Sequence, residues 1–300
     1  MGEVTTRSGF ASLVGRPNAG KSTLTNALVG EKVAITSSRP QTTRRAIRGI
    51  LTRPDGQLVL VDTPGLHRPR TLLGERLNAV VRETWSEVDV IALCLPADEA
   101  VGPGDRFISR ELAALRVPVL AVVTKTDLVE RDRVAAALVA AQRLGAEVGL
   151  EFAEIVPVSA VAGELVDLLA DLLVARLPEG PLLYPDGEPT DEPTETRIAE
   201  LIREAALEGV RDELPHSLAV SIDEMTAERD VTVIHATVHV ERDSQKPIVL
   251  GTGGSRLRTV GTTARHQIEA LLGGRVYLDL HVNVLKDWQR DPRLLRRLGY

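Results

Sequence analysis

The chain has 300 residues, of which 43% are hydrophobic and only 3% are aromatic. Its length predicts about two domains, and its composition allows each of them to bury a core made mainly of aliphatic side chains. The formal net charge of −6 is unremarkable for the whole chain, and the distribution of the charges matters more. Residues 1–193 carry 21 basic and 26 acidic side chains, whereas residues 244–300 carry 10 basic and 4 acidic ones. A polyanionic partner is therefore expected at the C-terminal end.

Cys94 is the only cysteine and lies in an apolar run. An internal disulfide is thereby excluded, and we expect a reducing compartment in which Cys94 fills space in the core. The N-terminal residues carry no basic-then-apolar signal, and no window approaches the roughly 18 uncharged apolar residues of a membrane span. These features predict a soluble, cytoplasmic protein.

The first motif is a phosphate-binding loop at residues 15–22, whose letters GRPNAGKS fit G-x-x-x-x-G-K-[ST]. An apolar run precedes it and a helical pattern follows, as the motif requires. Its glycines let backbone N–H groups turn toward phosphates, and the helix N-terminus adds partial positive charge. We expect Lys21 to reach the β- and γ-phosphates and the Ser22 hydroxyl to bind Mg²⁺. The predicted nucleotide-binding residues of this loop are Gly15, Arg16, Pro17, Asn18, Ala19, Gly20, Lys21, Ser22 and Thr23.

Short apolar runs alternate with helical patterns as far as residue 177. Strands are predicted at 11–14, 59–61, 88–95, 117–123 and 155–158, and helices near 72–86, 105–115, 130–144 and 163–177. This rhythm predicts an α/β fold, a P-loop domain with a doubly wound, mostly parallel sheet, over residues 1–178. In such a sheet ligands bind beyond the carboxyl ends of the strands.

Two segments can complete a Mg²⁺ site beside the phosphate loop. After the apolar run at 58–61 comes Asp62-Thr63-Pro64-Gly65, in which Asp62 can hold the hydration shell of the metal and Gly65 can offer its N–H to the γ-phosphate. A threonine of the polar loop at 31–43 can add its hydroxyl while its backbone senses that phosphate. Both Thr42 and Thr43 fit, and we favour Thr43. The predicted metal ligands are Ser22, Thr43 and Asp62.

The strand predicted at 117–123 is followed by Thr124-Lys125-Thr126-Asp127. The carboxylate of Asp127 can accept hydrogen bonds from both N1–H and the exocyclic amine of guanine, a pair that adenine does not offer. Lys125 can lay its aliphatic stem over the base, and the turn after the strand at 155–158 can present an N–H to the guanine O6. The nucleotide is therefore predicted to be GTP or GDP, bound here through Thr124, Lys125, Asp127, Ser159 and Ala160.

The residue that follows Gly65 is Leu66, whereas Ras-like proteins have a water-orienting Gln there. Two residues could compensate. One is His67, and the other is Asn18, because an Asn at this position in similar G domains helps to bind K⁺. We favour Asn18 and expect Asn18, Lys21 and Gly65 to carry the catalysis, with a low intrinsic rate.

The second half of the chain predicts a linker and an RNA-binding domain. Residues 178–194 hold five prolines, which predicts a semi-rigid connector over 179–194. A helix is then predicted at 195–213, strands at 217–223 and 231–240, a GxxG turn at 251–254 and a strand at 276–285. This order predicts an α+β type II KH domain with a basic tail over residues 195–300.

The GxxG turn is the predicted clamp for an RNA backbone, because glycines allow close approach and the next helix is basic. The predicted RNA-binding residues are Gly251, Thr252, Gly253, Gly254, Ser255, Arg256, Arg258 and Arg265. His235 and His239 share one face of a strand, but a metal site there is disfavoured because the sequence offers no third ligand nearby. Trp288 in the tail is expected to pack against the domain.

The joint pattern resembles the Era family of ribosome-assembly GTPases over nearly the whole chain. The segments that carry the resemblance are GRPNAGKSTLTNALVG (15–30), PQTTRR (40–45), DTPGLH (62–67), TKTD (124–127), SA (159–160), GTGGSRLRTVGTTAR (251–265) and DWQRDPRLLRRLGY (287–300). The resemblance implies a monomeric, GTP-switched protein that binds the 3′ end of 16S ribosomal RNA and assists maturation of the 30S subunit. It also implies peripheral association with the inner face of the cell membrane. Thr124 and Thr252 depart from the family pattern, which has Asn and often Lys there.

Two alternatives remain open. A GTPase of RNA modification or large-subunit assembly would carry an N-terminal folate-type domain or a second phosphate loop, and this sequence has neither. A nucleotide-independent RNA-binding protein with a degenerate G domain is compatible with Leu66 and Thr124. The intact Lys21, Ser22 and Asp62 oppose that reading.

Overall fold

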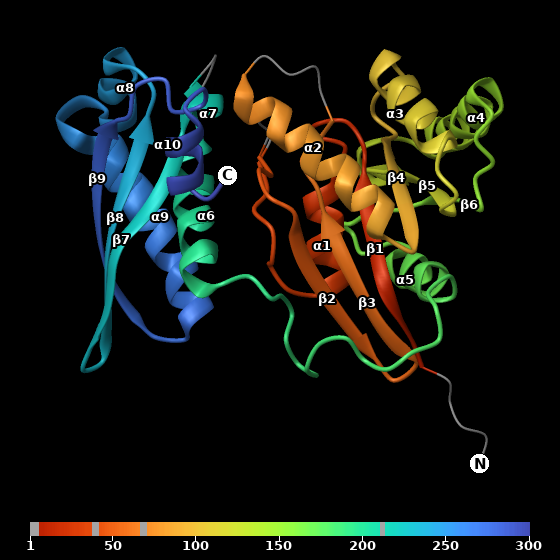
Figure 1. The fold of residues 1–300 in the computed structure, drawn as a ribbon, viewed down its shortest axis with the longest axis horizontal. Coiled ribbons are helices and arrows are strands. Elements are labelled where there is room, and N and C mark those ends of the chain that lie inside the picture. Colours follow the sequence, from red (N-terminus) through yellow and green to blue (C-terminus); the bar gives the residue numbers. More distant parts are fainter. Residues whose placement is uncertain (1–5, 38–41, 67–70, 211–213) are drawn as a thin grey trace. The chain divides into compact units, whose positions relative to one another are not determined.

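The computed structural model describes residues 6–37, 42–66, 71–210 and 214–300. These residues form two compact units (Figure 1). Unit 1 comprises Met1–Ala34, Thr43–Arg68 and Leu77–Asp191, and unit 2 comprises Ile35–Thr42, Pro69–Arg76 and Glu192–Tyr300. Two short segments from the first part of the sequence thus belong to the unit that is otherwise C-terminal.

Unit 1 is built on a six-stranded sheet with the strand order β2-β3-β1-β4-β5-β6. The strands are β1 Arg7–Val14, β2 Ile47–Arg53, β3 Gly56–Asp62, β4 Val90–Pro96, β5 Val119–Thr124 and β6 Glu154–Pro157. All neighbouring pairs are parallel except β2 and β3, which confirms the predicted mostly parallel sheet. The antiparallel edge strand β2 was not predicted, since Arg48, Thr52 and Arg53 interrupt its apolar pattern.

Helices cover both faces of this sheet (Figure 1). They are α1 Lys21–Val29, α2 Leu72–Glu87, α3 Pro103–Ala113, α4 Arg131–Val148 and α5 Val166–Val174. Apolar residues of α1 and α5 form one core with the sheet, and those of α2, α3 and α4 form the other. Cys94 of β4 is fully buried in the first core. This double layer confirms the doubly wound fold and places the carboxyl ends of β1, β3 and β5 at one edge.

Unit 2 has a three-stranded sheet with the order β7-β8-β9. Its elements are α6 Thr194–Leu207, α7 Leu214–Ser217, β7 Ala219–Glu228, β8 Val231–Val240, α8 Lys246–Leu250, α9 Ser255–Leu272, β9 Arg275–Val284 and α10 Pro292–Arg297. The pair β7 and β8 is antiparallel, and β8 and β9 are parallel. This topology is that of the predicted type II KH domain.

The core of unit 2 lies between α6, α9 and one face of the sheet, with Ile198, Ile202, Ala264 and Ile268 among its buried residues. The tail closes part of this unit. Trp288 is fully buried and its indole N–H donates to the Ser217 carbonyl at 3.1 Å, and its ring stacks on Tyr300 with centroids 5.8 Å apart. The expectation that Trp288 packs rather than remaining open is confirmed.

The proline-rich connector is held to unit 1 by hydrogen bonds. The side-chain oxygen of Gln57 accepts the N–H groups of Leu183 and Tyr184, each at 2.8 Å, and the N–H of Ile50 donates to the Pro189 carbonyl at 2.8 Å. These bonds satisfy backbone groups that the connector cannot pair internally. Among the described residues, no helix is long and apolar enough to cross a membrane.

Candidate functional site

The phosphate loop joins β1 to α1 in a tight turn. Asn18 takes the left-handed conformation (φ 63°), which is uncommon for a residue other than glycine. Lys21 is the first residue of α1 and is buried, with 6% of its surface exposed. Its ammonium group donates to the carbonyls of Arg16 at 2.9 Å and Gly15 at 3.1 Å. Burial lowers the pKa of Lys21, and the nearby charge of Asp62 opposes that shift.

Three side-chain oxygens converge beside Lys21. The Ser22 hydroxyl donates to Asp62 Oδ2 at 2.7 Å, and Thr43 Oγ1 lies 2.9 Å from Ser22 Oγ and 3.3 Å from the same carboxylate oxygen. Asp62 is fully buried, and its Oδ1 has no hydrogen-bond partner among the described residues. Burial raises the pKa of the Asp62 carboxyl because a low-dielectric environment disfavours its charged form. Two hydroxyls and an open carboxylate oxygen fit a hard cation such as Mg²⁺.

The segment after Asp62 lies against the phosphate loop. A Cβ on Gly65 would come within 2.7 Å of the Pro17 nitrogen, so a side chain would force the two loops apart. The Thr63 hydroxyl donates to the Leu13 carbonyl at 3.2 Å. Leu66 is 6% exposed and packs in the core formed by α2, α3 and α4. His67 lies outside the described residues.

The predicted guanine-binding residues lie at the carboxyl ends of β5 and β6. Asp127 sits in a short 3₁₀ helix, Thr126–Leu128, directly after β5, and its Oδ1 accepts the Ser159 hydroxyl at 2.6 Å. The Ser159 oxygen in turn accepts the Ala162 N–H at 3.0 Å. Lys125 pairs with Asp98 at 3.3 Å. The Ser159 hydroxyl thus holds one oxygen of the Asp127 carboxylate, and this exposed carboxylate lies at the carboxyl end of β5.

Thr124, which stands where the family pattern has Asn, connects two loops of the nucleotide site. Its buried hydroxyl donates to the Ala19 carbonyl of the phosphate loop at 2.7 Å, and its own carbonyl accepts the Ala97 N–H at 2.9 Å. A threonine hydroxyl therefore joins the guanine-side loop to the phosphate loop in this chain.

The sequence interpretation missed an anchor for the phosphate loop on α3. Asp105 is 1% exposed, and its Oδ1 accepts Arg16 Nε at 2.7 Å while its Oδ2 accepts the Gly102 N–H at 2.8 Å. Glu99 adds a second ion pair to Arg16 at 3.0 Å. The helix-capping role of Asp105 can be read from its position after Gly-Pro-Gly, but Arg16 is 89 residues away in the sequence, so no local signal points to this pair.

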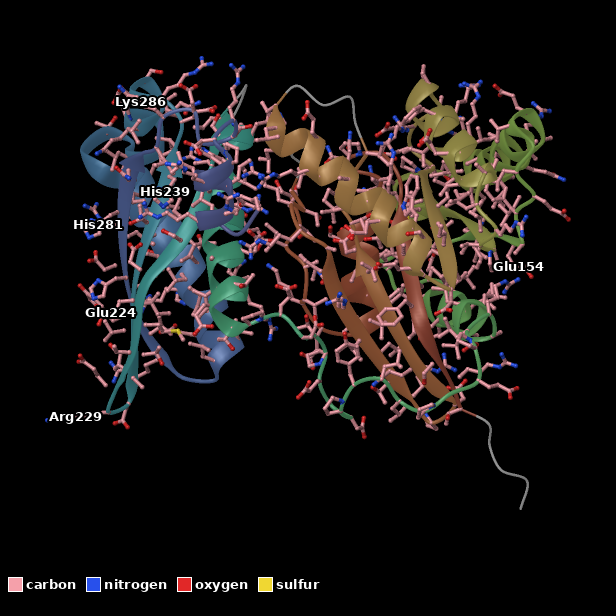
Figure 2. All side chains as sticks on the ribbon, viewed as in Figure 1. Glu154, Glu224, Arg229, His239, His281 and Lys286 are labelled. Atoms are coloured by element: carbon pink, nitrogen blue, oxygen red, sulfur yellow. The ribbon has the colours of Figure 1, made fainter. Side chains whose placement is uncertain are left out.

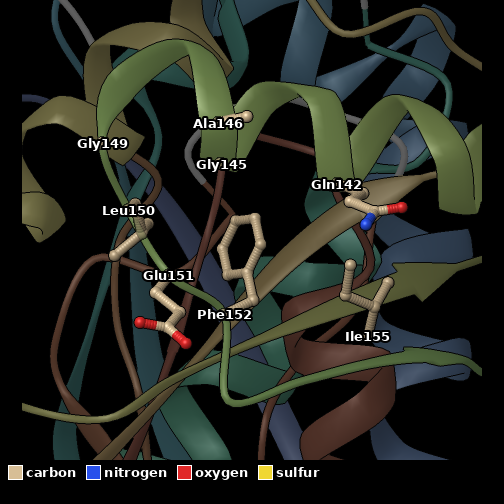
Figure 3. Close-up of a pocket in the computed structure, with 8 residues that line it drawn as sticks. All are labelled: Gln142, Gly145, Ala146, Gly149, Leu150, Glu151, Phe152 and Ile155. Atoms are coloured by element: carbon tan, nitrogen blue, oxygen red, sulfur yellow. The ribbon is translucent and has the colours of Figure 1, made fainter.

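A separate hollow of about 430 Å³ lies between α4 and β6 (Figure 3). Its lining includes Leu150, Phe152 and Ile155, with Glu151 as its acidic member. None of the predicted nucleotide-binding or RNA-binding residues lines it. It is therefore distinct from the site built on the phosphate loop.

The GxxG turn of unit 2 lies between α8 and α9. Gly251, Gly253 and Gly254 all have positive φ, at 72°, 58° and 75°. A Cβ on Gly251 would meet the Arg256 Cβ at 2.7 Å, whereas nothing lies within 4 Å of a Cβ on Gly253 or Gly254. The first glycine thus permits close packing within the domain, and the other two leave space in which a nucleic-acid backbone could approach.

The three arginines predicted beside this turn have different surroundings. Arg256 donates to the carbonyls of Ala206 (3.1 Å) and Glu208 (2.5 Å), so it holds the C-terminal end of α6. Burial lowers the pKa of its guanidinium. Arg265 pairs with Glu269 one helical turn along, at 3.7 Å. Arg258 is exposed and is the arginine of the three that most directly offers its charge to solvent.

Ile35, Thr36 and Thr42 are held inside unit 2 by α6. Ile35 belongs to the core of that unit, and the Thr36 N–H donates to Glu204 Oε1 at 2.8 Å. The guanidinium of Arg203, which is fully buried, donates to the Thr42 carbonyl. Of the two candidate threonines, Thr42 is therefore held through its carbonyl in unit 2, while the Thr43 hydroxyl joins the Ser22–Asp62 cluster of unit 1.

The outer face of the KH sheet carries three histidines. His235 and His281 lie 3.2 Å from the same Asp279 oxygen, and His239 Nε2 lies 2.9 Å from the Ser221 hydroxyl. Figure 2 labels His239 and His281 on neighbouring strands. Within the described ranges, no group of three or more His, Cys, Asp or Glu side chains is placed to hold a metal ion.

Comparison with known proteins identifies the family. The family model of 50S ribosome-binding GTPases matches residues 10–125, and that of the KH domain matches residues 213–289. The chain is 65% identical over 305 residues to GTPase Era of Streptomyces coelicolor, covering 99% of this chain and 96% of that relative. The chain belongs to the Era family of GTPases. It is also 64% identical over 299 residues to GTPase Era of Mycolicibacterium smegmatis, covering 98% and 99% of the two chains.

Solved Era structures have the same fold. A variant of Aquifex aeolicus Era bound to GDP and AlF₄⁻ matches with a TM-score of 0.93 at 35% identity, covering 98% of this chain and 99% of that one. Era in complex with MgGDPNP and nucleotides 1506–1542 of 16S ribosomal RNA matches with the same TM-score at 36% identity and the same coverage. Membership of the Era family confirms the predicted GTPase activity and the order of a G domain followed by a KH domain.

Proposed function

We propose that GTP bound in unit 1 controls RNA binding by the KH domain of unit 2, and that the RNA is the 3′ end of 16S ribosomal RNA. The relative solved with MgGDPNP and nucleotides 1506–1542 of that RNA supports this choice of nucleotide and partner. The protein thereby assists maturation of the 30S subunit. The proposed domain boundaries are a G domain at 1–178, a connector at 179–194 and the KH domain with its tail at 195–300.

One observation carries the switch. The Thr42 carbonyl is bound by Arg203 of α6, and the hydroxyl of the next residue, Thr43, joins the cluster of Ser22 and Asp62. A single peptide bond therefore separates a residue held by a KH-domain helix from a residue at the predicted metal site. Because losing the γ-phosphate releases such a loop threonine in GTP-driven switches, hydrolysis is expected to change the restraint on α6.

The residues of unit 1 are assigned as follows. Residues 15–23 would wrap the phosphates, with Lys21 supplying positive charge, and Gly65 would approach the γ-phosphate. Ser22, Thr43 and Asp62 would hold Mg²⁺, which neutralises charge on the phosphates when bound. The guanine would be held by Thr124, Lys125, Asp127, Ser159 and Ala160. The convergence of Ser22, Thr43 and Asp62 supports the metal assignment.

Hydrolysis is proposed to be slow without RNA. Leu66 packs in the core and cannot orient a water molecule. Asn18, exposed at the tip of the phosphate loop, is the proposed K⁺ ligand, and that ion would add positive charge at the phosphates. We propose a monomer, and the resemblance to Era further supports peripheral association with the inner face of the membrane.

The test is GTP hydrolysis with and without RNA of nucleotides 1506–1542, in K⁺ and in Na⁺. We expect RNA to raise turnover several-fold and K⁺ to exceed Na⁺, with Asn18→Ala removing the difference between the two ions. Equal turnover in both ions would sink the K⁺ role, and an absence of both RNA binding and RNA stimulation would sink the switch. A mant-GTP titration against ATP tests the degenerate-domain alternative, which requires no preference for GTP.

A further inference from the structure

The C-terminal tail exposes a group of arginines that the GxxG site does not use. Arg290, Arg293 and Arg296 recur at every third position and are all exposed. They line one hollow of about 510 Å³ together with Pro292, Asp287 and Asp291. These three guanidinium groups are therefore gathered around a single space large enough to admit phosphate groups.

None of these three guanidinium groups has a salt-bridge partner among the described residues, whereas several other arginines do. Arg16, Arg53, Arg106 and Arg176 each pair with a carboxylate at 3.1 Å or less. Holding three like charges together without counterions is unfavourable. Such a cluster is stabilised when an anion with several charges occupies it.

The two aspartates of the hollow reduce its charge without filling it. Asp291 caps α10, and its Oδ1 accepts the N–H groups of Arg293 at 2.7 Å and Leu294 at 3.3 Å. Asp287 is exposed in the preceding turn. Three arginines against two aspartates leave the lining with a positive balance, and Arg297 and Lys286 add charge to the same tail.

The arginines stand on a fixed support. Trp288 is fully buried, bonded to Ser217 and stacked on Tyr300. Gln289 is 7% exposed, and its side chain donates to Glu241 at 3.0 Å. Leu295 and Leu298 are buried on the inner side of α10. Because the tail backbone is anchored on both sides of Arg290, it loses little conformational entropy when the arginines bind phosphate groups.

We propose that Arg290, Arg293 and Arg296 form a second RNA-binding site, which takes backbone phosphates of the RNA held at the GxxG turn. This inference rests on the proposed function, because it assumes an RNA partner. Arginine guanidinium groups match phosphate oxygens in geometry and charge. Phosphate contacts fix the position of the RNA and add affinity, but they carry no sequence information.

The test compares the full chain with a triple variant, Arg290→Gln, Arg293→Gln and Arg296→Gln. The control removes the same number of charges from exposed arginines of α3 and α4: Arg110→Gln, Arg131→Gln and Arg143→Gln. Fluorescence anisotropy would measure binding of RNA of nucleotides 1506–1542, and of a scrambled RNA of equal length, between 50 and 300 mM salt. Melting temperatures check that all proteins are folded.

Removing three phosphate contacts should reduce the slope of log K against log salt by about 2. We expect affinity at 0.1 M salt to fall between about 10- and 100-fold, with an unchanged ratio between the two RNAs and an unchanged slope in the control. An unchanged slope in the tail variant, or an equal change in the control, overturns the second site. A variant with Lys at all three positions keeps the charges and should retain most of the slope of log K against log salt. This variant replaces the Gln variant in the comparison if the Gln variant does not fold.

The outcomes separate this inference from the proposed function. If the unmodified chain binds neither RNA in any nucleotide state, the proposed function fails. If it prefers the 16S RNA and the tail variant binds with the same salt slope, the proposed function stands and the second site is wrong.

Discussion

The nucleotide site and the RNA-facing surface use charge in opposite ways. Lys21 and Asp62 are buried beside each other, and hydroxyls and carbonyls surround them. Arg258 and the three tail arginines are exposed. A buried charge depends strongly on each partner, because water cannot replace a lost one, whereas exposed charges contribute small, salt-dependent increments that add together. Single substitutions should therefore disable the first region and only weaken the second.

The largest effect is expected from Lys21→Ala. The substitution removes a buried cation that would otherwise bind the phosphates, and charge-assisted hydrogen bonds contribute about 1.5–3 kcal/mol each. We expect affinity for mant-GTP to fall by several hundredfold or more, as measured by fluorescence titration. Lys286→Ala removes an exposed lysine of unit 2 and should leave affinity unchanged. A loss of less than tenfold in Lys21→Ala would contradict the contrast between the two regions.

Asp127→Asn should change which base is bound. The carboxylate accepts from two donors of guanine, and the amide offers a donor in place of one acceptor. Affinity for GTP should fall about 100-fold while affinity for xanthosine triphosphate, which has a carbonyl at the amine position, rises. Competition titrations against mant-GTP measure both. If the preference for GTP over the xanthine nucleotide is unaltered, Asp127 does not read the base.

A smaller effect is expected from Thr124→Val, which keeps the shape of the side chain and removes the hydroxyl bonded to Ala19. The Ala19 carbonyl would lose a buried partner, at a cost of about 1–2 kcal/mol. We expect affinity for GTP to fall about tenfold, and Thr124→Ser to retain most of it because the hydroxyl remains. Equal affinities of the valine variant and the unmodified chain would show that the link is dispensable.

The smallest effect is a pH dependence of stability in unit 2. Burial lowers the pKa of His239, Arg297 lowers it further, and Asp223 opposes the shift. The unfolded chain therefore takes up this proton first as the pH falls through about 6.5, and stability declines until the folded-state pKa is reached. Thermal unfolding would measure how far the free energy of unfolding falls between pH 7.5 and 5.5. In His239→Gln this fall should be smaller than in the unmodified chain, by less than about 1 kcal/mol.

Asn283→Gln is the matched control for that measurement, since Asn283 is exposed, pairs with His239 across β8 and β9, and does not titrate. It should leave the decline between pH 7.5 and 5.5 unchanged. If both variants show the same pH dependence as the unmodified chain, burial of His239 does not contribute to acid destabilisation.

Local motifs made the nucleotide site predictable from sequence. The phosphate loop, the Asp62–Gly65 segment and the Thr124–Asp127 segment each keep their residues within a few positions, and each follows a buried strand. Parallel strands bring such segments to one edge of a sheet, so the predicted βαβ rhythm was enough to place them together. The order of elements in the KH domain was predictable because each helix and strand has its own local apolar pattern.

Pairings over long sequence distances were not predictable. Asp105 holds Arg16 across 89 positions, and Arg256 bonds α6 rather than remaining open beside the GxxG turn. Ile35–Thr42 and Pro69–Arg76 belong to unit 2, although the sequence predicted two domains that each occupy one continuous stretch of the chain. Such contacts depend on which surfaces pack, and no periodicity of one segment encodes the surface of another.

The most direct test of the central claim is the affinity of one RNA for the two nucleotide states. Fluorescence anisotropy of labelled RNA of nucleotides 1506–1542 would be measured with the protein saturated first with GDPNP and then with GDP, each with Mg²⁺. The account predicts binding about tenfold tighter in the GDPNP state, a coupling of about 1.4 kcal/mol. Equal affinity in the two states would contradict it.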